Sequence, residues 1–154
     1  MEISANVTTF GGAITLRAGG AINQGAGVDV VSNGATIEVL AATGGLTMAD
    51  DARLMSGGGN IQADAGASVS LGGVHAIAGI VSITSQNADI VDAGDLHVDV
   101  ISAALRLNAG GSIGELGVGV NPVDVTAPVI SAVAGTGINL LAAGDVVIDS
   151  ACHR

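Results

Sequence analysis

The nine residues Ile14 to Ile22, ITLRAGGAI, place apolar residues at the first, third and ninth positions and small residues at the fifth to seventh. Most of this pattern returns as LRLNAGGSI at 105–113 and as INLLAAGDV at 138–146. Copies of the template are spaced by 23, 24, 20, 24 and 33 residues and begin at Ile14, Ile37, Ile61, Val81, Leu105 and Ile138. A period of this size is typical of solenoid proteins.

Apolar and polar positions stay separate in all six copies. The fifth position is alanine except at Ser85, and the second reads Thr15, Glu38, Gln62, Ser82, Arg106 and Asn139. Because successive side chains of a strand point to opposite faces, positions one, three and five should face an interior and position two should face solvent. The small residues that follow predict a corner. There we expect Gly20, Gly111 and Gly144 to adopt backbone angles that other residues resist.

Each repeat of about 22 residues has room for two or three short strands, and further alternating stretches occur at 28–32, 46–50, 67–73 and 96–102. The sequence therefore predicts an all-β fold, a parallel β-helix (solenoid) of about six coils that spans residues 1–154 as one segment. The 33-residue interval contains both prolines, Pro122 and Pro128, and predicts a loop insertion over about 115–128. A compact β-sandwich is the competing architecture.

Composition narrows the possible partners. The chain has 25 Gly, one Phe, no Trp and no Tyr, so small aliphatic residues must pack the core. A formal net charge of −10 and the lack of aromatic platforms argue against nucleic acid and against anionic membrane surfaces. Two long uncharged stretches, 65–88 and 125–144, alternate with a period of two, so we expect strands and no membrane insertion. Residues 1–10 lack a basic region, and an export signal would have to lie upstream.

The stretch DIVDAGDLHVDV at 89–100 holds the densest set of potential metal ligands. If Leu96 and Val98 point inward with Val100, then Asp95, His97 and Asp99 project together from the outer face. These groups could hold a metal ion, with Asp89 or Asp92 contributing from the preceding turn. The alternative is a solvated strand face, since one strand offers ligands in a line and not around a sphere. We favour the solvated face and predict no metal site and no cofactor.

Other motifs are weaker. GAGVDVV at 25–31, with Asp29, is similar to the glycine–aspartate nonapeptide of calcium-binding β-rolls, but that motif works in tandem and occurs once here. The pair Asp50 and Asp51, or Asp89 and Asp92, could serve as acid and base in a hydrolase or lyase. Cys152 and His153 are adjacent on an extended chain and should point apart. We predict no catalytic residues and no enzyme; the alternatives are a small β-helical carbohydrate-active enzyme and a calcium-binding β-roll.

The recurring LRAGGAI, LNAGGSIGE and LLAAGDVVID, with few aromatics and strong acidity, resemble the repeat regions of filamentous-haemagglutinin-like and other giant bacterial surface proteins. The resemblance covers most of the chain. It implies a right-handed β-helix that is exported and serves as an adhesin or stalk, extracellular or at the cell surface, with host or cell-surface molecules as partners. The family's secretion-domain motif is not matched, because VNPVDV at 120–125 shares only Asn121 and Pro122. No functional residue carries over.

The two ends of the chain lead to one further expectation. Solenoids normally close with polar capping structures, yet the repeat begins within about a dozen residues and the tail SACHR is too short to cover a coil. Either the chain is an excerpt of a longer array, or its open ends pair between molecules and give end-to-end self-association. We therefore expect a structural segment, a rigid spacer or display surface.

Overall fold

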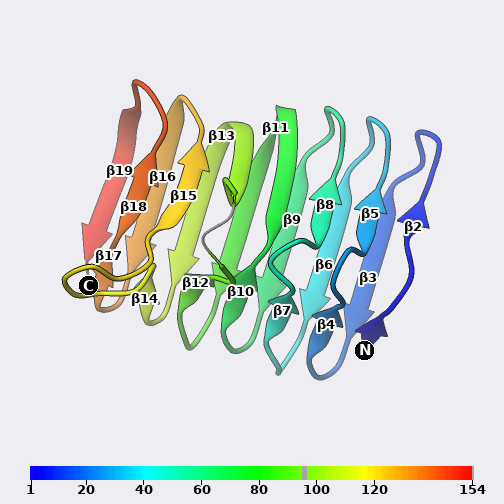
Figure 1. The fold of residues 1–154 in the computed structure, drawn as a ribbon, viewed down its shortest axis with the longest axis horizontal. Coiled ribbons are helices and arrows are strands. Elements are labelled where there is room, and N and C mark those ends of the chain that lie inside the picture. The colour runs from blue at the N-terminus through cyan, green and yellow to red at the C-terminus, as the bar shows by residue number, and fades with distance from the viewer. Residues whose placement is uncertain (95–96, 154) are drawn as a thin grey trace.

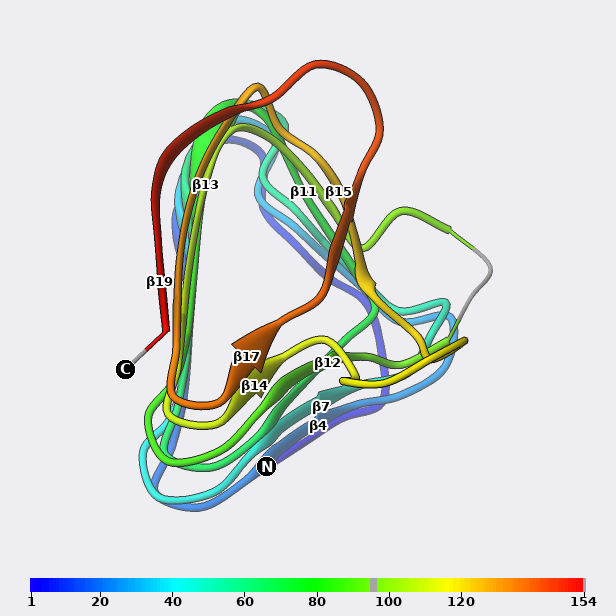
Figure 2. The same cartoon turned by 90° about the vertical axis from the view of Figure 1, so that its left-hand side faces the viewer.

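The computed structural model describes residues 1–94 and 97–153, with the backbone alone from residue 151 onward. The described chain is all-β and winds into a parallel β-solenoid of about six turns (Figure 1), which confirms the predicted fold class. The cross-section is triangular, and the N- and C-terminal coils lie at opposite ends of the solenoid axis (Figures 1 and 2). No described segment forms a helix that is long and apolar enough to cross a membrane.

Each coil contributes strands to three faces, which we number in chain order. Face 1 is a seven-stranded parallel sheet made of β1 (Glu2–Ile3), β4 (Ile22–Gln24), β7 (Leu46–Met48), β10 (Val69–Leu71), β12 (Ile90–Asp92), β14 (Ser112–Ile113) and β17 (Gly137–Ile138). Faces 2 and 3 belong to one twelve-stranded sheet, because two long strands run through the corner between them: β11 (Gly73–Ser85) and β13 (Val100–Ala109).

The remaining strands of that sheet divide between the two faces. Those on face 2 are β2 (Val7–Thr8), β5 (Asp29–Val31), β8 (Arg53–Met55), β15 (Val123–Thr126) and β18 (Leu140–Ala142). Those on face 3 are β3 (Ile14–Ala18), β6 (Ile37–Ala41), β9 (Ile61–Ala65), β16 (Val129–Ala134) and β19 (Val147–His153). We call β7–β9 coil 3, β10–β11 coil 4, β12–β13 coil 5 and β14–β16 coil 6.

The register on face 3 confirms the first five copies of the template. Ile14, Ile37, Ile61, Val81 and Leu105 lie opposite one another in successive coils, and all five side chains are buried. The second template position faces outward, where the Arg17 guanidinium of the same outer face donates a 2.7 Å hydrogen bond to the Glu38 carboxylate. Apolar side chains at the same position of successive coils therefore pack on one another and form one continuous core.

The prediction that the sixth copy of the template, which begins at Ile138, continues the column of the first five copies is wrong. Leu105 pairs with Ile130 of β16, 25 residues later, whereas Ile138 lies on face 1 opposite Ile113. The template failed here because face 1 and face 3 strands share the same alternation of apolar and polar residues, so a local match cannot tell the two faces apart.

The predicted insertion at about 115–128 is correspondingly shorter. Strand β15 occupies 123–126 and pairs with β13 and β18 on face 2. Only the segment between β14 and β15 leaves the sheets, and its residues 115–119 are exposed. The long interval of 33 residues arose from the misassigned copy and not from a long loop.

Glycines at the corner between faces 3 and 1 act mainly through close packing. Of the three expected to need unusual backbone angles, only Gly144 has a positive φ, of 103°, and it lies at another corner, between β18 on face 2 and β19 on face 3. A Cβ atom on Gly111 would instead meet the Asp89 carboxylate, and Gly20 has open space around it. At Gly66 a Cβ atom would lie 2.6 Å from the Ala42 carbonyl oxygen and 2.8 Å from the Thr43 Cα. Small residues here let the backbones of successive coils approach each other.

Gly66→Ala should therefore lower the free energy of unfolding by about 1–3 kcal/mol, the usual cost of overpacking. Gly20→Ala is the matched control, since it adds the same methyl group at the same corner with nothing within 4 Å, and it should change stability by less than about 1 kcal/mol. Urea unfolding followed by circular dichroism measures both. Equal effects of the two substitutions would contradict close packing at this corner.

Candidate functional site at the ridge between faces 1 and 2

Polar side chains occur along the ridge, which we define as the segments between β4 and β15 that join face 1 to face 2. These segments are 25–28, 49–52, 72, 93–99 and 114–122. Coil 4 crosses the ridge at Gly72 alone, where a Cβ atom would lie 2.5 Å from the Ala52 carbonyl oxygen. Coils 5 and 6 cross it with longer excursions, both visible at the right-hand corner of Figure 2. The short crossing of coil 4 leaves space that its neighbour can occupy.

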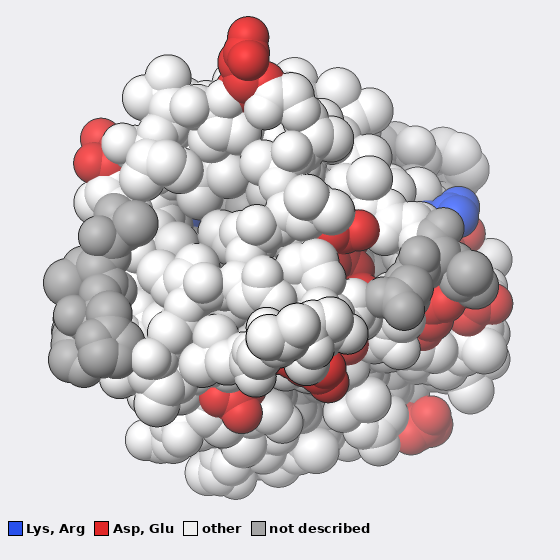
Figure 3. Space-filling view, turned by 60° about the vertical axis from the view of Figure 1, so that its left-hand side comes forward, with Lys and Arg blue, Asp and Glu red and all other residues white. Residues whose placement is uncertain are grey.

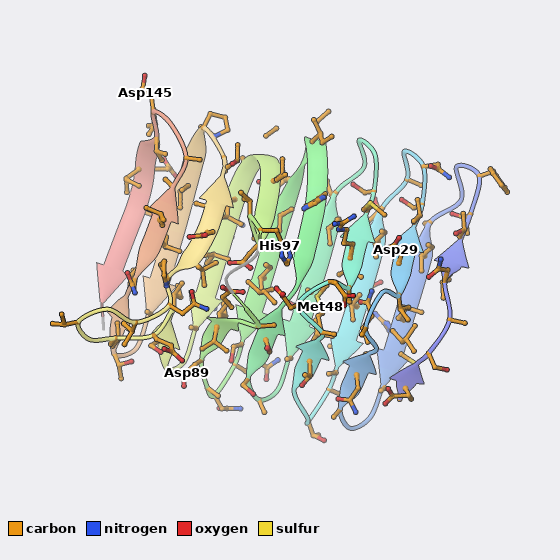
Figure 4. All side chains as sticks on the ribbon, viewed as in Figure 1. Asp29, Met48, Asp89, His97 and Asp145 are labelled. Atoms are coloured by element: carbon orange, nitrogen blue, oxygen red, sulfur yellow. The ribbon has the colours of Figure 1, made fainter. Side chains whose placement is uncertain are left out.

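Coil 5 folds back across coil 4 to contact coil 3. The His97 Nδ1 atom lies 3.2 Å from the Asp50 Oδ1 atom, although Asp50 belongs to the segment between β7 and β8. Gly94 makes this approach possible, because a Cβ atom there would lie 2.7 Å from the Asp50 Cγ. Figure 4 shows His97 in front of the sheets at the middle of the ridge.

His75 lies beneath this excursion on β11. Burial lowers the pKa of His75 below its ordinary value, and the nearby charges of Arg53 and His97 act in the same direction, against a hydrogen bond to the Val98 backbone. The Nε2 atoms of His75 and His97 are both buried without a hydrogen-bond partner among the described residues. Gly73, at an outward position of β11, is buried because Arg53 and His75 cover it.

A second polar group lies where coils 5 and 6 meet. The Asp99 side chain is fully buried, and its Oδ2 atom accepts a 2.8 Å hydrogen bond from the Asp124 backbone N–H. Burial raises the pKa of Asp99 to about 9, and a hydrogen bond to the Asp92 carboxyl adds to this effect. The Asp92 Oδ2 atom in turn accepts a 2.7 Å hydrogen bond from the Asn121 side chain of the coil 6 excursion.

The predicted outward row of Asp95, His97 and Asp99 is therefore not observed. Asp95 and Leu96 lie outside the described residues. His97 is half-buried against Asp50, and Asp99 is buried, with its carboxyl against Asp92 and the Asp124 backbone. Asp89 lies at the opposite end of β12, where it accepts hydrogen bonds from the Ser112 backbone and hydroxyl at 2.6 and 2.9 Å.

The other sequence candidates also separate. Asp50 and Asp51 point to different coils, since Asp51 accepts a 2.9 Å hydrogen bond from the Gly27 backbone N–H while Asp50 contacts His97. Asp29 lies on β5, three coils before the coil 5 excursion, as Figure 4 shows. The side chains of Cys152 and His153 lie outside the described residues.

Sequence reasoning missed the partners that other coils supply. Asn121 and Asp124 reach the Asp92–Asp99 pair from coil 6, and His75 and Arg53 lie under the coil 5 excursion. One signal was available in the 20-residue spacing between Ile61 and Val81, the shortest of the series. A short coil next to long ones indicates that a neighbouring excursion folds over it.

The chemistry open to this arrangement is limited. Acidic side chains are scattered over the face shown in Figure 3, which is otherwise largely uncharged. No group of three or more His, Cys, Asp or Glu among the described residues is arranged to hold a metal ion. Asp92 and Asp99 lie within hydrogen-bonding reach of each other, closer than the separation of about 5–9.5 Å that glycosidases keep between their two carboxyl groups.

A shallow hollow of about 240 Å³ lies beside this pair and is lined mainly by apolar groups, from Val98, Asp124, Val125, Leu141, Ala142 and Ala143.

Comparison of the chain with protein-family models, curated proteins and solved structures finds no match.

The lowered pKa of His75 gives a pH dependence with a definite sign. Below about pH 6.5 the unfolded chain binds a proton at this imidazole that the folded protein resists, so the free energy of unfolding attributable to His75 falls as the pH falls. His75→Gln should remove this part of the slope in urea unfolding between pH 5 and 7. Imidazole NMR titration tests the cause directly, and a His75 pKa above 6.5 would contradict it.

Proposed function

We propose that this chain is a rigid structural segment, a stalk or display surface, of an exported bacterial adhesin or other surface protein. The observation that supports this most is the unbroken stack of inward columns, in which one buried core runs through the coils without a domain boundary. Each coil adds about 4.8 Å along the axis, so this architecture converts chain length into a defined distance.

Carboxylates on the ridge and at the corner between faces 3 and 1 hold coils together. Asp51 binds the backbone of the preceding coil, Asp89 binds that of the following coil, and Asp50 contacts His97 two coils away. Carboxylates that accept hydrogen bonds from backbone N–H groups stabilise turns and cost less to bury than free ones. This supports a structural function for residues that the sequence offered as acid–base or calcium-binding candidates.

The cellular context rests on the resemblance of the repeats to those of filamentous-haemagglutinin-like proteins. In that setting the outer faces would present side chains to host or cell-surface molecules. The acidic composition, with a single aromatic residue, disfavours nucleic acid and membrane insertion.

Self-association through the terminal coils is part of the same proposal, with a second copy of the chain as the partner. Strands β17, β18 and β19 have a hydrogen-bonded neighbour on one side within the chain, as do β1, β2 and β3. Leu141 and Ile148 of the last coil are 58% and 56% exposed. Unpaired parallel edges with apolar side chains are templates for further strands.

Antibodies raised against the chain should label intact cells of the bacterium that encodes it. Surface exposure follows from the proposed export, and immunofluorescence before and after permeabilisation measures it. A cytoplasmic protein probed in the same cells is the control. Labelling that requires permeabilisation would contradict the proposed location.

The purified chain should associate as its concentration rises. Multi-angle light scattering should show a mass that increases with concentration, and Ile148→Asp should reduce this increase by placing a charge at the edge. Asp145→Asn, on an exposed turn of the same coil, is the control and should behave like the unaltered chain. A constant monomer mass at high concentration would contradict the pairing of ends.

A further inference from the structure

The carboxyl of Asp99 lies in a setting that does not suit a negative charge. Its side chain is fully buried, and one oxygen, Oδ2, accepts a hydrogen bond from the Asp124 backbone N–H. The other oxygen, Oδ1, receives no hydrogen bond from any donor of the described residues. A buried carboxylate with a single donor is costly, whereas a protonated carboxyl would use Oδ1 as a donor.

Asp92 is the acceptor that such a donor needs. Its Oδ1 atom accepts a 2.9 Å hydrogen bond from the Gly94 backbone N–H, and its Oδ2 atom accepts one of 2.7 Å from the Asn121 side chain. Both Asp92 oxygens already act as acceptors, so the donor in the contact between the two side chains is the Asp99 carboxyl. With that proton in place both side chains have hydrogen-bond partners on both oxygens.

We propose that Asp92 and Asp99 form a proton-dependent clamp, which joins the end of β12 to the start of β13 and fastens coil 6 to coil 5 through Asn121 and the backbone of Asp124. Loss of the shared proton leaves a buried Asp99 carboxylate beside the half-buried Asp92 side chain and weakens the contacts between the two coils.

The charged groups around the clamp favour its protonated state. Asp124 faces it from β15, at the same junction as Asp92. Glu115 lies in the coil 6 excursion and accepts a 3.4 Å hydrogen bond from the Asn121 backbone N–H. The cationic or titratable groups of the adjoining elements, Arg53, His75 and His97, interact with one another and with Asp50. These surroundings agree with the raised pKa of Asp99, about 9.

The sign of the resulting pH dependence is opposite to that of His75. In the unfolded chain Asp99 loses its proton near its ordinary pKa of 3.8, while the folded protein retains it up to about pH 9. The folded state therefore holds a proton that the unfolded state lacks, and stability falls as the pH rises from about 4 to about 9. Above about pH 9 the clamp is ionised in the folded protein as well.

Asp99→Asn tests the clamp without removing its hydrogen bonds, because the amide can donate to Asp92 and accept from the Asp124 N–H at any pH. The urea midpoint of the unaltered chain should fall between pH 5 and 9, and that of Asp99→Asn should fall less and exceed it at pH 9. Asp145→Asn, which removes an exposed carboxylate, should keep the unaltered slope. An Asp99→Asn variant with the unaltered slope would overturn the clamp.

Two measurements on the unaltered chain complete the test. The ¹³C resonance of the Asp99 carboxyl should titrate near pH 9, and titration near pH 4 would overturn the proposal. Calcium chloride at pH 7 should leave the urea midpoint unchanged beyond the effect of matched ionic strength. A calcium-dependent rise that Asp99→Asn abolishes would overturn the proton clamp in favour of a cation site.

Discussion

The in-register stacking of apolar columns is the constraint on which this structure depends. In the column that includes Ile37, Ile61 and Val81, each inward side chain packs on its counterpart in the next coil while the backbones hydrogen-bond in parallel. A single coil could not bury these side chains, so stability comes from neighbours and the core extends along the axis. The near-absence of aromatic residues follows, because a large ring would not fit a column of alanine, valine and isoleucine.

The same constraint explains why the coils differ in length at the ridge. Strand registers on the three faces must match from coil to coil, but the segments between faces 1 and 2 are free to differ in length. Coil 4 crosses at Gly72, and the longer excursion of coil 5 covers it and reaches Asp50. Polar groups thus come together from different coils: Asp50 meets His97 from two coils away, and Asn121 and Asp124 of coil 6 reach Asp92 and Asp99 of coil 5.

The sequence could predict the period and the orientation of side chains, since both are local properties of a strand. It identified the inward column from Ile14 to Leu105 and the outward position of Glu38. It could not separate face 1 from face 3 at Ile138, because both faces use the same alternation. It also placed Asp99 in solvent, because the contacts of the Asp99 carboxyl come from Asp92 and from the backbone of Asp124, which follows 25 residues later.

The pairing of the coil 6 strands with their neighbours is the most direct test of the continuous stacking of coils. It distinguishes such a stack from a repeat that is interrupted by a long insertion. Methyl-labelled NMR of the chain would show which side chains are in contact across successive coils. The structure predicts cross-peaks between Leu105 and Ile130 and between Ile113 and Ile138. Cross-peaks between Leu105 and Ile138 instead would contradict the stacking of the three faces.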